Sequence, residues 1–124
     1  MLNDVILVVE DDSIEAMDIK KTLESAGFSI PEIASTGQKA LDILSKFKPD
    51  LVLMDIVLKG EENGIEIAEI IKEKYRIPVI YLTAHSEAST VEMAKLTDPY
   101  AYVVKPFDTD ELIQTIKIAL NKEY

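Results

Sequence analysis

The chain has 124 residues, of which 48% are apolar and 29% charged, and this length and composition are typical of one globular domain. It contains no cysteine and a single histidine, His85, which excludes disulfides, a thiolate zinc site and a multi-histidine metal centre. A bound metal would need oxygen ligands, as Mg²⁺, Mn²⁺ and Ca²⁺ do. The formal net charge of −10 argues against a nucleic-acid groove, which needs clustered lysine and arginine.

The sequence shows no targeting or membrane-spanning segment. The apolar run near the amino terminus lacks a basic leader and a small-residue cleavage site, so we expect no signal peptide. No apolar run approaches the ~20 residues that a membrane-spanning helix requires. We therefore expect a cytoplasmic protein with one domain over residues 1–124.

Five short apolar runs have the length and flanks of buried β-strands. Four of them are almost continuously apolar, which is typical of strands covered on both faces. The second run is the weakest and contains Pro31, which suits an edge strand. The expected strands are Val5–Val9, approximately Phe28–Ile33, Leu51–Met54, Pro78–Leu82 and Ala101–Val104.

Segments with helical spacing follow the strands. The first carries an apolar stripe and is followed by Gly27 as a C-terminal cap. Asp108 is expected to cap the last helix, with Glu111 as its capping-box partner. The expected helices are Ser13–Ala26, Gln38–Phe47, Gly64–Lys74, a more polar Ser86–Leu96, and one that begins after Asp108.

The alternation of strand and helix predicts the fold class. Five repeats of this pattern indicate an α/β fold, a doubly wound parallel sheet with helices on both faces. A five-stranded sheet of this flavodoxin-like kind commonly has the strand order 2-1-3-4-5. Its site lies outside the carboxyl ends of the strands.

Polar residues follow four of the five expected strands directly. Because the carboxyl ends of parallel strands meet at one edge of a sheet, these residues are expected to gather there. A single acid in a surface loop would carry no information. Acids, a hydroxyl and a lysine that each follow an apolar run directly are harder to explain by chance. They are Glu10, Asp11 and Asp12 after the first strand, Asp55 after the third, Thr83 after the fourth and Lys105 after the fifth.

These residue types suit phosphoryl transfer to a carboxylate. Crowded carboxylates repel, so at neutral pH they need a cation or a proton to coexist. Lys105 supplies one positive charge, and Mg²⁺ favours a few carboxylates, waters and a substrate phosphate. The cation and the ammonium would neutralise the charge of the transferring group, and the accepting aspartate would become an acyl phosphate.

Four segments carry a family resemblance that covers essentially the whole chain: ILVVEDD, LVLMD ending at Asp55, YLTA with Thr83, and YVVKPF with Lys105. Together they resemble the receiver domain of bacterial and archaeal two-component response regulators. The resemblance implies a phospho-accepting signalling switch, and not an enzyme that turns over an external substrate.

The resemblance also implies a metal-dependent acceptor site. Asp55 matches the aspartate that accepts the phosphoryl group. Glu10 and Asp11 match the acidic pair that holds Mg²⁺, with Asp11 as the direct ligand. The backbone carbonyl of Val57 matches a further metal ligand, and Mn²⁺ could replace Mg²⁺.

The same resemblance implies a switch. Thr83 matches the hydroxyl that turns toward the phosphoryl group, and Tyr102 matches the aromatic that changes rotamer as Thr83 moves. Lys105 matches the lysine that pairs with Asp55 at rest and with the phosphoryl group afterwards, and its bond to Pro106 is expected to be cis.

The implied partners are a sensor histidine kinase or phosphotransfer protein and a downstream effector that the sequence does not identify. The sequence does not decide whether a homodimer forms on phosphorylation. No nucleic-acid or membrane partner is expected. The last helix ends close to Tyr124, so we expect no effector domain after it in this chain, which either works alone or is part of a longer regulator or hybrid kinase.

Several positions keep a plainer interpretation. Asp12 is better explained as a helix cap than as a metal ligand, and His85 as an exposed loop residue. Without the family, Tyr102 would be a half-buried strand aromatic. After Asp55 the loop departs from the common family pattern, with Lys59 in place of a proline and one extra residue before Gly64. The loop geometry therefore stays open, as does the lifetime of the phosphorylated state, because Val57 and His85 flank the route of the attacking water.

Three other functions fit the sequence less well. A Mg²⁺-dependent aspartyl-phosphate phosphohydrolase typically has a second aspartate two residues past the nucleophile, where this chain has Val57. A nucleotide- or flavin-binding module would need a glycine-rich loop after the first strand, where the chain reads EDDSIE. A degenerate receiver that serves only as a protein-interaction module is disfavoured by the complete set of motif residues.

Overall fold

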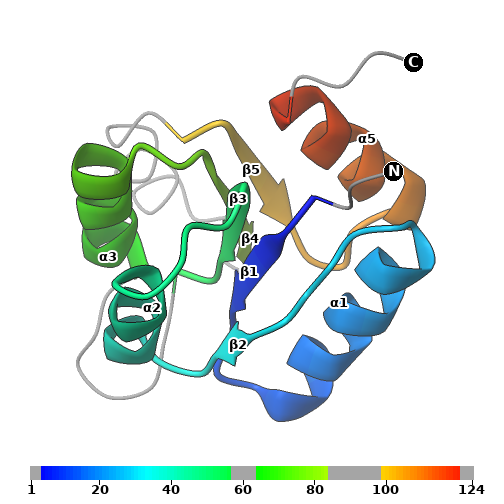
Figure 1. Cartoon of the computed structure of the whole chain (residues 1–124). Helices are drawn as coiled ribbons and strands as arrows, with labels where there is room; N and C mark the ends of the chain where they lie inside the picture. Colours follow the sequence, from blue (N-terminus) through cyan, green and yellow to red (C-terminus); the bar gives the residue numbers. More distant parts are fainter. Residues whose placement is uncertain (1–3, 57–63, 84–98, 121–124) are drawn as a thin grey trace.

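The computed structural model describes residues 4–56, 64–83 and 99–120. Five parallel strands form one sheet in the order β2-β1-β3-β4-β5, and helices cover both of its faces (Figure 1). The predicted fold class and strand order are confirmed. The strands are β1 (Ile6–Val9), β2 (Ile33–Ala34), β3 (Leu51–Met54), β4 (Val79–Thr83) and β5 (Ala101–Val104).

The helices of the described residues lie in two pairs on opposite faces of the sheet. α1 and α5 cover one face, and α2 and α3 cover the other (Figure 1). No helix within the described ranges is long and apolar enough to cross a membrane. The expected helix Ser86–Leu96 lies outside the described residues. The helices are α1 (Ser13–Ser25), α2 (Gly37–Leu44), α3 (Gly64–Ile70), which continues as the π-helical turn η1 (Ile71–Tyr75), and α5 (Thr109–Ala119).

Both faces of the sheet are buried, which explains the continuous apolar runs. Successive side chains of a strand point to opposite faces. In β1, Leu7 and Val9 pack in the core on the α2–α3 side, and Ile6 and Val8 pack on the α1–α5 side. Each of these side chains is at most 1% exposed, and burying one contributes about 1.5–3 kcal/mol.

The expected bounds of the second strand were wrong. β2 comprises only Ile33–Ala34, and further upstream Ser29 makes one isolated bridge to Val5. Pro31 lies between these two contacts and has no N–H to donate, so a continuous ladder cannot form across it. Phe28 is nevertheless buried in the α1–α5 core, which accounts for the apolar pattern of this segment.

Capping residues fix the ends of the helices. Asp108 precedes α5 and accepts a hydrogen bond from the backbone N–H of Glu111, as the predicted cap requires. Gly27 follows α1 with a φ of 100°, a left-handed conformation that glycine adopts without steric cost. α2 ends at Leu44, earlier than the expected Phe47, and Ser45 is its C-terminal cap.

The helix expected over Gly64–Lys74 extends to Tyr75 in the structure and ends in an unusual turn. Its last five residues, Ile71–Tyr75, are π-helical, and the N–H of Arg76 donates to the carbonyls of Ile71 and Lys72, both at 3.1 Å. Arg76 has a φ of 56°, in the left-handed region. A non-glycine residue in this conformation is sterically strained.

Candidate functional site

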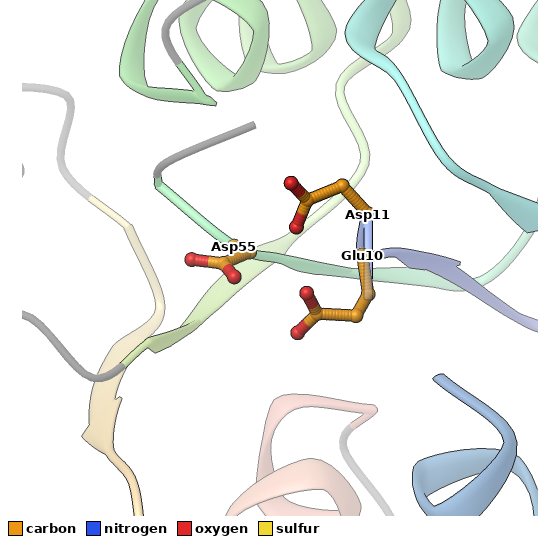
Figure 2. A group of neighbouring side chains, drawn as sticks. All are labelled: Glu10, Asp11 and Asp55. Carbon is orange, nitrogen blue, oxygen red and sulfur yellow. The ribbon is translucent and has the colours of Figure 1, made fainter. Parts of the chain in front are cut away.

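The residues that follow β1 and β3 are brought together by the register of the sheet. Val9 is paired with Met54, so Glu10 and Asp55 leave neighbouring strands at the same level. The backbone fixes both positions, because the N–H of Asp55 donates to the carbonyl of Val9 at 3.0 Å and that of Glu10 to the carbonyl of Ala34 at 2.9 Å. The sequence prediction that acids meet at this edge is confirmed for Glu10, Asp11 and Asp55 (Figure 2).

The three carboxylates form a cluster of suitable size for a small cation. One oxygen from each of Glu10, Asp11 and Asp55 lies within 4.8 Å of the other two. Mg²⁺ binds oxygens at about 2.1 Å in an octahedron, so its ligands lie about 3–4 Å apart. Small side-chain rotations would bring these oxygens into that range. The all-oxygen donor set therefore fits Mg²⁺.

Lys105, which follows β5, brings a positive charge to the cluster. Its Nζ lies 2.6 Å from Oε1 of Glu10, 3.3 Å from Oε1 of Glu15 and 3.7 Å from Oδ2 of Asp55. The side chain of Lys105 is only 12% exposed. The ion pair with Asp55 that the resemblance implies is present at 3.7 Å, but among the described residues the shortest ion pair of Lys105 is made with Glu10.

Glu10 is held by hydrogen bonds at both of its carboxylate oxygens. Oε1 accepts from Lys105, and Oε2 accepts from the backbone N–H of Asp12 at 3.2 Å. With both oxygens engaged, Glu10 is less suited to direct metal ligation than Asp11. Asp12 itself caps α1, accepting from the N–H groups of Ile14 and Glu15, as the plainer interpretation of this residue predicted.

Burial shifts the ionisation of this pair. Burial raises the pKa of Glu10, as does the charge of Asp55, and with the opposing hydrogen bonds from Lys105 and Asp12 included this pKa lies at about 7. Burial would lower the pKa of Lys105, but the hydrogen bond to Glu10 and the surrounding negative charges outweigh it, so this pKa is raised. The 2.6 Å contact from Nζ of Lys105 to Oε1 of Glu10 has the length of a charge-assisted hydrogen bond.

Gly64 lets α3 begin close to Asp55. Its N–H donates to the carbonyl of Ile56 at 2.7 Å. A Cβ at Gly64 would overlap the carbonyl oxygen of Asp55, so only glycine permits this approach. The loop around Lys59 and the expected metal ligand Val57 lie outside the described residues.

The residues expected to form the switch lie on β4 and β5. The backbone of Thr83 pairs with Val104, and Tyr81 pairs with Tyr102. Tyr102 is half-buried and packs against the core on the α2–α3 side. The Lys105–Pro106 bond is cis, as expected. His85 lies outside the described residues.

Two residues of this region were missed by the sequence analysis. Glu15 reaches Lys105 from the first turn of α1, and its spacing from Asp12 would have suggested only a capping box. Tyr81 packs its ring against that of Tyr102. Its position two residues before Thr83 was the available signal, but the run PVIYL was interpreted only as a buried strand.

Comparisons with known proteins agree with this geometry. Residues 6–117 match the model of the response regulator receiver domain. The transcriptional regulatory protein PdtaR of Mycobacterium tuberculosis is 36% identical over 117 residues, which are 94% of this chain and 57% of that protein. The heme response regulator HssR of Staphylococcus saprophyticus is 35% identical over 116 residues, 94% of this chain and 51% of that protein. The chain thus spans about half the length of these curated relatives.

Solved structures share the fold. The N-terminal domain of a response regulator/sensory box/GGDEF three-domain protein from Carboxydothermus hydrogenoformans is 36% identical, with a TM-score of 0.86 over 95% of this chain and 94% of that one. A CheY-like receiver domain protein from Methanospirillum hungatei is 27% identical, with a TM-score of 0.87 over 97% of this chain and 95% of that one.

A five-stranded parallel sheet with an acidic cluster at its carboxyl edge is the architecture of CheY-like receivers. The chain belongs to the response regulator receiver domain family. It is therefore a receiver domain of a two-component system, a class of signalling switch. The cluster of Glu10, Asp11 and Asp55 fits a phospho-accepting site.

Proposed function

We propose that this domain is a Mg²⁺-dependent switch that accepts a phosphoryl group on Asp55 from a sensor histidine kinase or a phosphotransfer protein. The observation that carries the proposal is the meeting of Asp55, Glu10 and Asp11 oxygens within 4.8 Å, with the Lys105 ammonium 3.7 Å from Asp55. Three acids and one lysine at the carboxyl edge of a parallel sheet provide a nucleophile, cation ligands and a compensating charge.

Asp55 acts as the nucleophile. One of its carboxylate oxygens forms a bond to phosphorus while the bond from phosphorus to the imidazole nitrogen of the donor breaks, and that nitrogen keeps the electron pair. When bound, Mg²⁺ would neutralise the charge on the transferring group. Asp11 and Asp55 would hold the metal, and Glu10 would keep Lys105 at the site.

Lys105 compensates charge before and after transfer. At 3.7 Å from Oδ2 of Asp55, its ammonium needs only a small movement to reach a phosphoryl oxygen on that carboxylate. Most of the Lys105 side chain is shielded from water, so its attraction for a phosphoryl dianion is screened less than that of a surface lysine. A charge-assisted hydrogen bond of this kind would stabilise the phosphorylated state.

The signal would leave through β4 and β5. Phosphorylation can shift the domain between two states only if one of them makes better contacts with the phosphoryl group. In the proposed switch Thr83 makes that contact, and Tyr102 turns as Thr83 moves. The support is their placement on adjacent paired strands, with Tyr102 two register positions from the pair of Thr83 and Val104. The altered surface would then be presented to a downstream effector.

The acceptor is tested by labelling with a small phosphodonor. Incubation with acetyl phosphate and Mg²⁺ should add one phosphoryl group to the intact protein, as measured by mass spectrometry. Asp55→Asn should abolish the addition, and chelation of Mg²⁺ should block it. Asp42→Asn, which removes an exposed acid on α2, is the matched control and should label normally. Undiminished labelling of Asp55→Asn would rule out the assignment.

A further inference from the structure

Lys105 is shared by carboxylates from three separate elements. Glu10 lies at the end of β1 and Asp55 at the end of β3, whereas Glu15 belongs to the first turn of α1. The Nζ–oxygen distances are 2.6, 3.7 and 3.3 Å respectively. Glu15 is therefore closer to the ammonium than Asp55 is, although Asp55 is the proposed acceptor.

The local structure of α1 explains why Glu15 reaches Lys105. Asp12 is the N-cap and Glu15 is the third residue of the helix, the spacing of a capping box. In that motif the glutamate would accept the N–H of the cap residue. Here the N–H of Asp12 donates to Glu10 instead. The Glu15 carboxylate accepts from Lys105.

We propose that Glu15 is a positioning residue for Lys105, which holds the ammonium on the α1 side of the site and competes for it with Asp55 and, later, with the phosphoryl group. The inference rests on the proposed phospho-accepting function. It also gives α1 a direct electrostatic link to the acceptor through a single side chain.

The strength of this competition follows from exposure and chain flexibility. Lys105 carries a point charge on a flexible stem with three donors, so it can exchange partners without moving the backbone. Glu15 is 47% exposed, and water screens its attraction for Lys105. The expected effect is therefore modest, about two- to fivefold in a rate, the range that exposed ion pairs support.

Phosphorylation rates with acetyl phosphate at a fixed millimolar Mg²⁺ concentration test the proposal. Glu15→Gln removes the competing charge and should raise the rate about two- to fivefold, because Lys105 is released toward Asp55. Asp18→Asn is the matched control: Asp18 lies one turn further along the same helix and is also exposed. A general charge effect on the anionic donor would raise the rates of both variants equally, and that outcome would overturn the proposal.

A second background separates action through Lys105 from any other effect of Glu15. In Lys105→Ala protein, Glu15→Gln should leave the rate unchanged. A rate increase that persists there would contradict the proposed positioning role. An unlabelled wild type would overturn the phospho-accepting function and the competition with it, whereas a labelled wild type with an unchanged Glu15→Gln rate would overturn only the role of Glu15.

The contact itself can be measured without phosphorylation, which covers the case that Lys105→Ala labels too slowly to follow. The measurement uses Mg²⁺-bound protein with ¹³C-labelled lysine, and the Cε–Hε resonance of Lys105 is assigned by its loss in Lys105→Ala. This resonance should shift in Glu15→Gln and should not shift in Asp18→Asn. A resonance that responds equally to both variants, or to neither, would overturn the proposal.

Discussion

The rings of Tyr81 and Tyr102 pack against each other across strands β4 and β5, with their centroids 5.9 Å apart and their planes inclined by 56°. The two residues are register partners. Tyr81 is fully buried, whereas Tyr102 is half-buried at the edge strand. A tilted pair at this separation contributes about 0.5–1.5 kcal/mol beyond burial, and here that contact stabilises the inward position of Tyr102.

Removing the ring of Tyr81 should therefore lower the population of the inward rotamer of Tyr102, in which its ring packs against Tyr81 and the core. We expect Tyr81→Leu to increase the outward population of Tyr102 in unphosphorylated protein, while Tyr81→Phe, which keeps the ring, should leave it near the wild-type level. Side-chain Hα–Hβ coupling constants of Tyr102 report the rotamer directly. Equal populations in the Leu and Phe variants would show that the ring contact does not set the rotamer.

Thr83 is expected to couple phosphorylation to Tyr102. Thr83→Ala should still accept a phosphoryl group, because Asp55 and the acidic cluster are intact, but the signal should stop there. Amide chemical shifts around Tyr102 measured with and without a phosphoryl mimic such as beryllofluoride test this coupling. Responses of equal size in wild type and Thr83→Ala would count against it.

Lys105 should not be replaceable by arginine. Its Nζ sits among three carboxylates at 2.6–3.7 Å, a space that suits a compact ammonium better than a wide planar guanidinium. We expect Lys105→Arg to accept a phosphoryl group and to signal poorly. Labelling by mass spectrometry and binding of the phosphorylated variant to an effector would check the two parts separately. Full effector binding by phosphorylated Lys105→Arg would contradict the prediction.

Arg76 offers a test that is independent of the acceptor site. It is exposed and has a φ of 56° and a ψ of 41°, a conformation that glycine adopts without the steric cost. We expect Arg76→Gly to stabilise the protein by about 0.5–1 kcal/mol. Arg76→Ala keeps a Cβ in the same conformation and should show no gain. Urea unfolding midpoints of the three proteins measure the difference, and a Gly variant no more stable than the Ala variant would refute the strain argument.

The sequence predicted the parts of the fold that depend on local pattern. Strands β3 and β5 have the expected bounds. For β3 the reason is that a run buried on both faces must be apolar at every position; β5 is apolar throughout although it is only partly buried. The helix caps at Asp12 and Asp108 could be predicted because a short acceptor side chain before an apolar periodic segment satisfies the free N–H groups of the first turn. Pro31 indicates an edge strand, but the short length of β2 could not be predicted, because the buried Phe28 gives this segment the apolar pattern of a longer strand.

The acidic cluster was predictable because topology alone brings the carboxyl ends of parallel strands to one edge. Contacts between individual side chains were not. The pairing of Lys105 with Glu10 and Glu15, closer than with Asp55, depends on rotamers and on which acceptor already holds the N–H of Asp12. The packing of Tyr81 on Tyr102 depends on the register between β4 and β5, which no single strand encodes.

Asp11 provides the sharpest test of the cluster as a common metal site. Among the described residues, the carboxylates within 3.7 Å of Lys105 Nζ are those of Glu10, Glu15 and Asp55, and Asp11 is not one of them. Its charge is therefore the least compensated of the three clustered acids. Removing it should relieve repulsion, so we expect Asp11→Ala to stabilise the metal-free protein by ~1 kcal/mol.

Mg²⁺ should reverse this order. Binding to the folded state alone stabilises wild type by about 2.7 kcal/mol at a hundredfold excess over the dissociation constant, whereas Asp11→Ala lacks the expected direct ligand and should gain much less. Urea melts in EDTA and in millimolar Mg²⁺ measure both effects, and Asp18→Ala, a surface acid on α1, should behave as wild type in its response to Mg²⁺. If Asp11→Ala is less stable than wild type in EDTA and gains as much from Mg²⁺, then Glu10, Asp11 and Asp55 do not form a shared metal site.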